Sequence, residues 1–477
     1  MVLRYTTPPT TPPPEPGTAK IFLGRLVHST SPTAFEILPH AAVGVHPNGT
    51  IAFVDTSPHS PTAEAIRSLH AAHQDFLTAQ VLQLKPSQFL FPGLVDTHLH
   101  APQWINLALG MDGTLREWME EYTDPEEASF SDLRKAEKIY AEVVATTLAL
   151  GSTTVAYNGS LHLEATKALA RECWLRGQRA VVGKMCVTTG STQGNWEDSV
   201  AASLESTQQL INYVHTLCPP LGGDALVRAS VQPRGGPYCP PALMAGLGAL
   251  CTLYPNLLVQ GHMCETPSDI TRTLALHPPF TSYSAMYRHH NLLHPLSIQA
   301  HSIHLQPADL ENLRETGAGV AHCPTSNTVL RDGVCDVRRL LDAGVKVGLG
   351  TDCSAGYMPS ILQAMRAASS VSRHLAMHTR NEHSILSFPE LLYMATLGGA
   401  AVLGLQGKVG RFAPGMEFDA LVVDVAGVIS AGPELWGGGE GGDAEAMVRK
   451  WVFLGDERAV RRVFVGGREV GGCDRGV

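Results

Sequence analysis

The chain has 477 residues, of which 44% are hydrophobic and 17% are charged. This composition is typical of a globular protein, and the length favours one large domain with a smaller one beside it. Its 35 basic and 44 acidic residues give a net charge of -9, which argues against a nucleic-acid partner because nucleic-acid-binding surfaces are basic.

Targeting and redox signals point to a cytoplasmic protein with no membrane partner. The sequence contains no apolar run long enough to span a bilayer, and the N-terminal "TTPPTTPPPEPG" lacks the apolar region of a signal peptide. Ten cysteines include no C-x-x-C pair, so we expect reduced thiols rather than a disulfide framework.

The N-terminal part of the chain is predicted to be rich in β-strands. After a Pro/Thr-rich tail at 1–17, which we expect to be disordered, strand-like patterns cover residues 20–29 and 41–55. Asn48-Gly49 lies between two alternating apolar runs in the second segment, which is the strongest short-range signal of a hairpin.

The C-terminal part shows the same pattern. Strand-like segments cover residues 418–425, 448–455 and 460–470, and Gly466-Gly467 supplies a tight turn within the last of them. We expect the two ends of the chain, 18–88 and 406–477, to pair into one small β domain.

Residues 89–405 alternate short apolar strands with helical patterns, such as 131–151 and 307–317, the latter closed by Gly317. Eight strand-helix units over roughly 300 residues favour a (β/α)8 TIM-like barrel, although a doubly wound parallel sheet fits the same pattern. The predicted strand cores are Leu90–Val95, Thr153–Ala156, Ala180–Val187, Leu226–Val231, Leu257–Gly261, Ser297–Ala300, Gly319–Ala321 and Val345–Gly350.

Metal-binding side chains follow four of these strands. They are His98 and His100 after the first strand, His262 and then Glu265 after the fifth, His301 after the sixth, and Asp352 after the eighth. In a barrel these positions meet at the C-terminal mouth, where active sites lie. Imidazole and carboxylate suit Zn²⁺, which lowers the pKa of a bound water from about 15.7 to about 7. Glu265 is placed to carry protons without being a ligand.

Each of these residues also has an ordinary structural explanation. A histidine pair in a chain with 21 histidines is more often a surface feature, and His262 and His301 alone are compatible with buried structural histidines. Asp352 alone could cap the following helix. The metal site is favoured because all of them fall at the same end of predicted strands.

Two other residues were weighed for the same site. His322 follows the seventh strand, but it precedes "CPTSN" and is ranked below the others because it could serve only to fix that loop. Lys184 on the third strand could bridge a second metal if carbamylated, although an ordinary buried or paired lysine is the commoner role.

Several motifs, in order along residues 86–470, resemble the metal-dependent amidohydrolase superfamily and, within it, the guanine deaminase family. The superfamily motifs are "PGLVDTHLH", H-x-x-E at 262–265, the lone His301, "AHCPTSN" at 321–327 and "GLGTD" at 348–352. The motifs that are similar to guanine deaminases are "VDTHLHAPQW", "GKMC" at 183–186, "QPRGGPYC" at 232–239, "ATLGGAAVLGL" at 395–405 and "GRFAPGMEFDAL" at 410–421.

The resemblance implies hydrolytic deamination of guanine to xanthine and ammonia by a homodimeric enzyme with one Zn²⁺ per subunit. The implied ligands are His98, His100, His262 and Asp352, with His301 as a further possible ligand or as the residue that orients the water. The activated water attacks C2 of guanine, Asp352 accepts its proton, and Glu265 protonates the ring nitrogen and serves the leaving amine.

The resemblance also implies the purine contacts. Gln103 and Arg234 would hold the purine edge, because an amide offers a donor and an acceptor and a guanidinium suits O6 and N7. Without the family resemblance, Gln103 is interpreted as a solvent-facing loop amide and Arg234 as a structural ion-pair partner. His100, His262, Glu265, Asp352 and the backbone of Gly235 complete the implied substrate contacts. Gly235 stands where the family tends to have an aromatic residue, so stacking by that side chain is lost, and 353–360 also differs from the family.

Two other functions stay open from the residues. One is a different heteroaromatic amidohydrolase, acting on cytosine, adenine-like, triazine or S-adenosylhomocysteine substrates; the pair Gln103 and Arg234 favours an oxo-purine instead. The other is a scaffold that keeps the barrel without catalysis, which is disfavoured because every expected metal ligand is present.

Overall fold

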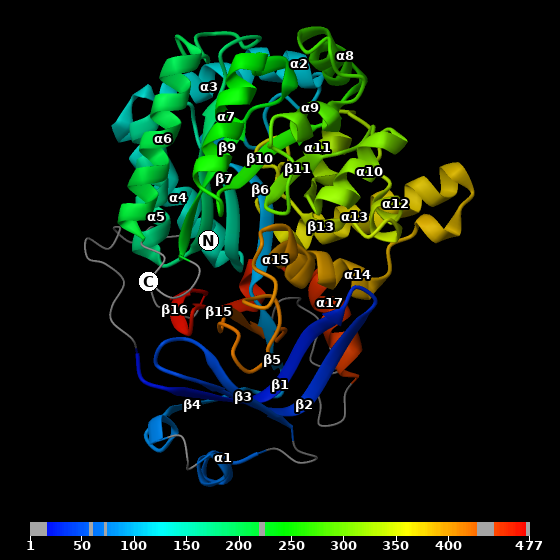
Figure 1. Ribbon diagram of the computed structural model, residues 1–477. Coiled ribbons are helices and arrows are strands. Elements are labelled where there is room, and N and C mark those ends of the chain that lie inside the picture. The colour runs from blue at the N-terminus through cyan, green and yellow to red at the C-terminus, as the bar shows by residue number, and fades with distance from the viewer. Residues whose placement is uncertain (1–16, 57–60, 71–73, 219–224, 427–442, 474–477) are drawn as a thin grey trace.

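The computed structural model describes residues 17–56, 61–70, 74–218, 225–426 and 443–473. Two eight-stranded sheets organise them: a parallel sheet with helices packed around its outside, and a mixed sheet formed by the two ends of the chain (Figure 1). Except for Gly17, the predicted tail at 1–17 lies outside the described residues.

The parallel sheet is the (β/α)8 barrel that the sequence predicts. Its strands follow one another in chain order, and each is paired in parallel with the next. The strands are β6 (Leu94–His100), β7 (Ser152–Asn158), β8 (Arg179–Cys186), β9 (Val227–Pro233), β10 (Leu258–Met263), β11 (Ser297–His301), β12 (Gly319–His322) and β13 (Lys346–Leu349).

Helices cover the outside of the barrel between successive strands (Figure 1). The 17-residue helix α4 begins where Asp132 accepts hydrogen bonds from the backbone of Arg134 and Lys135, which is the usual role of an N-cap aspartate. Gly317 ends the predicted helix at 307–317 with a left-handed φ of 69°. The barrel helices are α4 (Leu133–Ala149), α5 (Leu163–Arg176), α6 (Val200–Leu217), α7 (Pro241–Leu253), α8 (Pro267–Leu276), α9 (Tyr283–His289), α10 (Pro307–Thr316), α11 (Pro324–Val329), α12 (Val337–Asp342) and α13 (Ile361–Thr379).

Shorter elements extend the loops at the barrel mouth and close its base. Those after β6 are the 3₁₀ helix Ala101–Asn106, α2 (Leu115–Trp118), the π-helical turn Met119–Thr123, α3 (Asp124–Ala128) and the 3₁₀ turn Ser129–Ser131. Gly236–Tyr238 follows β9 as a 3₁₀ turn, and α13 is followed by Glu382–Ser384, α14 (Phe388–Tyr393), the π-helical turn Met394–Gly398 and α15 (Gly399–Val402).

Hydrogen bonds join the first barrel strand, β6, to the segment that follows the last one, β13. Asp96 accepts from the backbone N–H of Thr351 at 3.0 Å and from its hydroxyl at 2.6 Å. The N–H of Asp352 donates to the carbonyl of His98 at 2.8 Å. These bonds fix the strand that carries two of the predicted ligands against the segment that carries a third.

The mixed sheet has the order β16-β15-β14-β5-β1-β2-β3, and β4 pairs with β1. Its hairpins turn at the predicted positions: β2 and β3 flank Asn48-Gly49, and β15 and β16 flank Gly466-Gly467, with both glycines of the second turn at positive φ. The strands are β1 (Lys20–Ser31), β2 (Ala34–Val45), β3 (Ile51–Thr56), β4 (Gln80–Gln83), β5 (Gln88–Pro92), β14 (Ala420–Asp424), β15 (Val460–Val465) and β16 (Arg468–Gly471), joined by α1 (Ala63–Leu69) and the 3₁₀ turns Gln74–Phe76 and Glu457–Ala459.

Two sequence predictions of strands are wrong. The apolar run predicted as the strand core Leu90–Val95 divides at Gly93: β5 belongs to the mixed sheet, where it pairs with β1 and β14, and β6 begins the barrel. A continuous apolar run does not reveal such a division, because both strands are buried throughout.

The segment predicted as a strand at 448–455 lies in a helix, α17 (Ala444–Leu454). Met447, Val448, Trp451 and Val452 are its buried residues, and their i, i+1, i+4, i+5 spacing gives one apolar face at the helical period. Asp443 caps the helix by accepting from the N–H groups of Glu445 and Ala446. The cap lies upstream of the apolar run, which by itself is too short to tell a strand from a helix.

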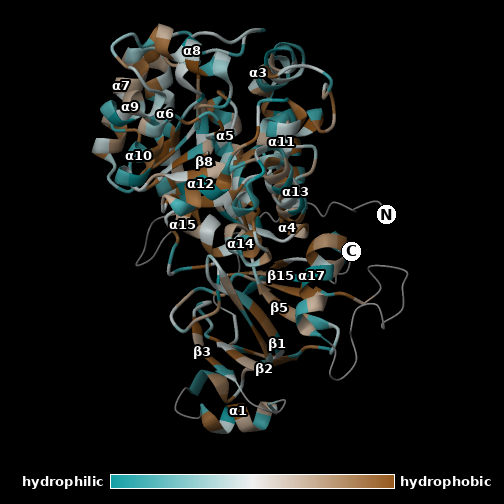
Figure 2. Ribbon diagram, turned by 90° about the vertical axis from the view of Figure 1, so that its right-hand side faces the viewer, coloured by the Kyte–Doolittle hydropathy of each residue, from teal (hydrophilic) through white to brown (hydrophobic). Residues whose placement is uncertain are grey.

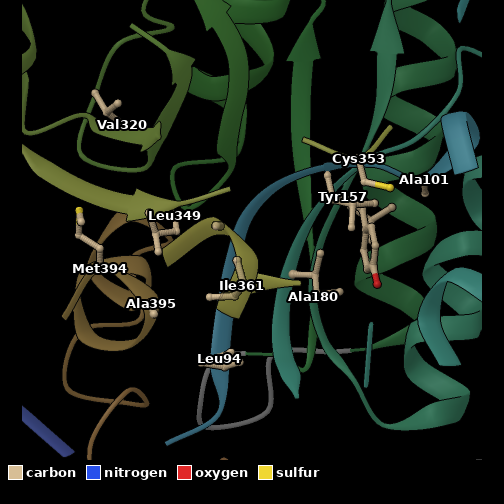
Figure 3. Packing of buried hydrophobic residues seen from close by; sticks show 14 of the residues in the cluster. Leu94, Ala101, Tyr157, Ala180, Val320, Leu349, Cys353, Ile361, Met394 and Ala395 are labelled. Atoms are coloured by element: carbon tan, nitrogen blue, oxygen red, sulfur yellow. The ribbon is translucent and has the colours of Figure 1, made fainter. Parts of the chain in front are cut away.

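The hydrophobic core extends through both sheets. Figure 3 shows part of the cluster at the barrel, where Leu94, Ala180 and Leu349 come from three different strands and Ile361 and Met394 from the helices outside. In Figure 2 the strands of the mixed sheet are largely brown, which marks their apolar composition. A separate cluster inside that sheet stacks Phe22 on Phe418 at 4.5 Å between ring centroids.

A buried ion pair connects the base of the barrel to the mixed sheet. Arg179, the first residue of β8, is 2% exposed, and its Nε donates to Asp419 at 2.9 Å while Nη2 donates to Glu417 at 2.6 Å. Arg179 thereby joins the beginning of a barrel strand to the segment that precedes β14.

We expect Arg179→Ala to destabilise the protein by about 3–5 kcal/mol, because it leaves the buried carboxylate of Asp419 without its cation. The free energy of unfolding, measured by urea denaturation against the wild type, tests this value. Arg458→Ala is the control, since Arg458 forms an exposed pair with Asp456 and exposed pairs contribute little. A loss below about 1 kcal/mol for Arg179→Ala would contradict the expectation.

Among the described residues, one helical stretch is long and apolar enough to cross a membrane by length and composition. It covers Glu382–Val402, has a mean hydropathy of 1.4, and is 67% buried inside the protein. Core helices of globular proteins have the same properties, so this stretch is weak evidence for a membrane span.

Candidate active site at the mouth of the barrel

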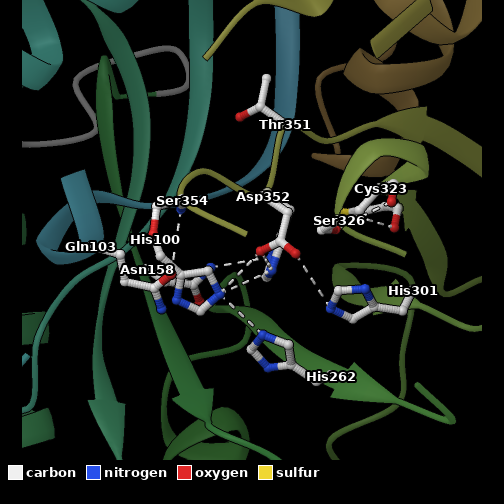
Figure 4. Close-up of polar contacts among 12 residues, drawn as sticks. His100, Gln103, Asn158, His262, His301, Cys323, Ser326, Thr351, Asp352 and Ser354 are labelled. Carbon is white, nitrogen blue, oxygen red and sulfur yellow. Dashed lines mark hydrogen bonds and ion pairs between the residues drawn. The ribbon is translucent and has the colours of Figure 1, made fainter. Parts of the chain in front are cut away.

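Five of the predicted site residues converge where the barrel strands end: Figure 4 labels His100, His262, His301 and Asp352, and His98 contacts His100 and Asp352. His98 and His100 are among the last three residues of β6, His262 is the penultimate residue of β10, and His301 is the last residue of β11. Asp352 lies three residues beyond β13. The histidines therefore belong to the strands themselves, whereas the sequence analysis placed them just after.

The donor atoms of four residues lie within a few ångströms of one another. His100 Nε2 is 3.1 Å from His98 Nε2 and 3.1 Å from His262 Nε2. Asp352 Oδ1 is 3.2 Å from His98 Nε2 and 3.5 Å from His100 Nε2. His301 Nε2 lies farther out, 3.9 Å from Asp352 Oδ2, in a second donor group with His98 and Asp352.

These separations fit a metal ion. A tetrahedral zinc with ligands at about 2.0–2.1 Å holds neighbouring ligand atoms about 3.3–3.4 Å apart, close to the observed 3.1–3.5 Å. His100 Nε2 faces two other Nε2 atoms at the same time, and one proton on it could satisfy only one of them. A single cation would satisfy all three nitrogens, so the donor set has the spacing expected of a metal site.

The protonation states agree with this role. Burial lowers the pKa of His98, and it lowers the pKa values of His100 and His262 well below the usual range, which leaves their nitrogens neutral. Burial acts to raise the pKa of Asp352, but its hydrogen bond to His98 and the neighbouring imidazoles hold that pKa below its usual value. Neutral imidazoles and an ionised carboxylate are the forms that bind metals.

Two asparagines contact the outer nitrogens of these imidazoles. The Asn158 amide lies 3.2 Å from His98 Nδ1, and Asn327 Oδ1 lies 2.9 Å from His301 Nδ1. Asn327 Oδ1 can accept the proton of His301 Nδ1, which leaves Nε2 of that ring free for a metal, whereas Asn158 faces His98 Nδ1 with its Nδ2. Asn158 is the last residue of β7, so the rule that located the histidines from strand ends could also have found it.

Glu265 lines the same cavity beside the donor cluster, with Oε1 at 3.4 Å from His301 Nε2. Burial raises the pKa of Glu265 well above its usual range, and the charges of Asp269 and Asp352 act in the same direction. Asp269 and Asp332 also line the cavity, and each has one buried carboxyl oxygen without a partner among the described residues. Glu265 is predicted from the sequence, whereas Asp269 and Asp332 are not.

The cavity has a volume of about 640 Å³, and Gln103, Arg234 and Gly235 line it together with the donor cluster. Gln103 is on the 3₁₀ helix Ala101–Asn106, and Arg234 follows β9 directly. Their side chains are 3% and 4% exposed, so neither is a solvent-facing loop residue. Arg234 is also an ion-pair partner of Glu127, which was its predicted structural role.

Gly235 leaves room beside Arg234. A Cβ there would have ordinary contacts, 3.4 Å from the Tyr283 hydroxyl and 3.6 Å from Cδ2 of Tyr238. The aromatic surface at this wall of the cavity is that of Tyr238, whose ring centroid is 5.6 Å from the Arg234 guanidinium carbon. Gly235 has no aromatic ring, but Tyr238, three positions later, places one at this wall of the cavity.

His322 and Lys184 lie outside the two groups of potential metal ligands among the described residues. His322 is buried, and burial lowers its pKa to about 3, but neither group of potential metal ligands among the described residues includes it. Lys184 is fully buried, and its Nζ donates to Glu197 Oε1 at 2.5 Å. Lys184 is therefore an ordinary paired lysine, the commoner role that the sequence analysis gave it.

The chain is similar to known proteins over nearly its full length. The model of the amidohydrolase family matches residues 89–470. A probable guanine deaminase of Schizosaccharomyces pombe is 41% identical over 96% of this chain and 84% of its own length. Guanine deaminase of Mus musculus is 34% identical over 95% of this chain and 97% of its own length.

Among solved structures, guanine deaminase from C. acetobutylicum with bound guanine has a TM-score of 0.83 at 29% identity, covering 94% of this chain and 99% of that chain. Matches of this extent include both the barrel and the mixed sheet. The chain belongs to the amidohydrolase family and groups there with the guanine deaminases.

Proposed function

We propose that the protein is a zinc-dependent guanine deaminase, which hydrolyses guanine to xanthine and ammonia. The observation that carries this proposal is one cavity lined both by the His/Asp donor cluster and by the buried amide and guanidinium of Gln103 and Arg234. Similarity to guanine deaminases over nearly the full chain supports it.

We propose that His98, His100, His262 and Asp352 hold one zinc per subunit, with His301 beside it. The 3.1–3.5 Å spacing of the four donors supports this set, and His301, 3.9 Å from Asp352, is placed to orient the attacking water. A zinc ion so held supplies a water with a pKa near 7 instead of about 15.7.

The chain's own carboxyl groups move the protons. Glu265 holds a proton, because its pKa is raised by burial, and it is placed to protonate a ring nitrogen of the purine and then to serve the leaving amine. Asp352 is ionised and accepts the proton of the attacking water. The Gln103 amide and the Arg234 guanidinium hold the oxo-purine edge, and the backbone of Gly235 lines the same wall.

A substrate panel tests the assignment. We expect ammonia release from guanine, with kcat/KM at least about 10²-fold above that for cytosine, adenine, a triazine amine and S-adenosylhomocysteine, because buried polar groups reject ligands that leave them unpaired. Turnover of cytosine or a triazine without turnover of guanine would replace the proposal by the other amidohydrolase activity. No turnover at all and no bound metal would favour the scaffold alternative.

We further propose, from the family resemblance and the sequence composition, a cytoplasmic homodimer that binds neither nucleic acid nor membranes. The net charge of -9 supports the absence of a nucleic-acid partner. Sedimentation velocity of the full chain tests the dimer, and a monomer at micromolar concentration would contradict it.

A further inference from the structure

The proposed purine-binding residues share one buried partner. Glu127, on α3, is 1% exposed. Its Oε1 accepts from Gln103 Nε2 at 2.8 Å, and its Oε2 accepts from Arg234 Nη1. The same carboxylate lies 4.0 Å from His100 Nδ1. It therefore touches both proposed purine contacts and approaches a donor histidine.

Glu127 is itself held in place. Asn195 Nδ2 donates to Glu127 Oε2 at 2.8 Å and to Asp124 Oδ1 at 3.0 Å. Asp124, one helical turn before Glu127, is 3.8 Å from Arg234 Nη2 and accepts from the N–H and hydroxyl of Thr192 at 2.8 Å each. Every donor here is buried or half-buried, and a hydrogen bond in such a low-dielectric environment is stronger than one in water.

The carboxylate decides which way the Gln103 amide points. An ionised carboxylate only accepts hydrogen bonds, so the amide must present Nε2 to Glu127. The carbonyl oxygen then lies on the other side, where it accepts from the Ser354 N–H at 3.4 Å. The donor and the acceptor that Gln103 offers to the cavity are thereby fixed.

We propose that Glu127 is a positioning residue for substrate recognition, which fixes the amide of Gln103 and the guanidinium of Arg234 in the orientation that an oxo-purine requires. This inference rests on the proposed function. Glu127 acts through these two side chains, and it lies outside the sequence motifs quoted above.

Glu127→Gln is the most direct test. Its amide oxygen can still accept from Arg234 and Asn195, but its NH₂ then faces the NH₂ of Gln103. Gln103 escapes this contact by rotating its amide by about 180°, which exchanges donor and acceptor on the cavity side. We expect KM for guanine to rise about 10- to 100-fold, as for the loss of a charged hydrogen bond, while kcat changes less than about threefold.

Asp419→Asn is the matched control. It also neutralises a buried carboxylate that pairs with an arginine, Arg179, but at the opposite end of the barrel. Loss of stability without a change in KM is expected there. An equal rise of KM in Asp419→Asn and Glu127→Gln would overturn the proposal, because the effect would then be one of general stability.

A double mutant separates positioning from packing. If Glu127 acts through Gln103, Glu127→Gln adds less to KM in a Gln103→Ala background than in the wild type. Asn195→Ala is a second variant, which frees the Glu127 carboxylate without neutralising it and is expected to raise KM about three- to tenfold.

The outcomes are distinct from those that test the function itself. Guanine turnover by the wild type with an unchanged KM in both Glu127→Gln and Asn195→Ala would refute the role of Glu127 alone. Fold-changes that multiply in the double mutant would refute its action through Gln103. No guanine turnover by the wild type would instead refute the proposed function.

Discussion

Glu265→Gln is expected to abolish nearly all guanine turnover while leaving the metal in place. Proton transfer by a positioned side chain contributes about 10²–10⁴-fold to rate, and glutamine keeps the size of the side chain but cannot transfer a proton. The kcat for ammonia release should therefore fall by about that factor. Bound metal, measured by elemental analysis, should equal that of the wild type, because Glu265 Oε1 contacts His301 and lies outside both donor groups.

Glu390→Gln is the control for this prediction. Glu390 is also a buried glutamate, 3% exposed, but it pairs with Arg338 on the outer helices. Its replacement should change stability and leave kcat near the wild-type value. Full activity of Glu265→Gln would rule out Glu265 as the proton carrier. Loss of metal in that variant would show that it supports the ion instead.

His262→Ala is expected to lose both the metal and the activity. His262 Nε2 is in direct contact with His100 Nε2 at 3.1 Å, so alanine removes one of four donors. A metal ion contributes several kcal/mol to the transition state, which corresponds to a loss on the order of 10³-fold or more in kcat/KM. Thermal unfolding should lose its dependence on added zinc, since bound metal stabilises only the folded chain.

The control is His383→Ala, at an exposed histidine paired with Asp342. It should keep both metal and activity, because exposed pairs contribute little. Removal of metal from the wild type with a chelator should reproduce the loss of activity, and zinc should restore it. Retained zinc and turnover in His262→Ala would contradict the ligand assignment, and restoration by iron or manganese alone would contradict zinc as the metal.

Much of the fold is predictable from the sequence because the signals are local. Alternating apolar strands and helical patterns predict eight units, and seven of the eight predicted barrel strand cores overlap the strand that occupies that position by most of their length. The exceptions have physical causes. The run at Leu90–Val95 contains two strands of different sheets, and the apolar face of α17 is shorter than its capped helix.

The proposed metal-binding residues follow from the sequence for a related reason. His98, His262 and His301 lie near the carboxyl end of a barrel strand and Asp352 lies three residues beyond one, and parallel strands bring those ends together. Topology alone places them near one another. Their spacing of 3.1–3.5 Å, which distinguishes a metal site from a group of buried histidines, is a property of the folded chain.

The burial and the partners of Glu127 and Asp124 could not be predicted from the sequence. In "TDPEEA" they resemble the acidic first turn of an exposed helix, where carboxylates are common. Only the packing of α3 over the barrel mouth buries Glu127 against Arg234 and Gln103, which are 107 and 24 residues away from it in the chain, and brings Asp124 to Arg234.

The sequence by itself therefore predicted the alternating strands and helices, most strands of the mixed sheet and the candidate donor residues, because periodicity and strand ends are encoded by near neighbours. Tertiary structure alone decided which sheet received Gln88–Pro92, how Asp96 and Thr351 close the barrel, and which carboxylate orients the proposed purine contacts. Those outcomes depend on contacts between segments far apart in the chain, and hydrogen bonds and ion pairs of that kind leave no periodic pattern in the residues that form them.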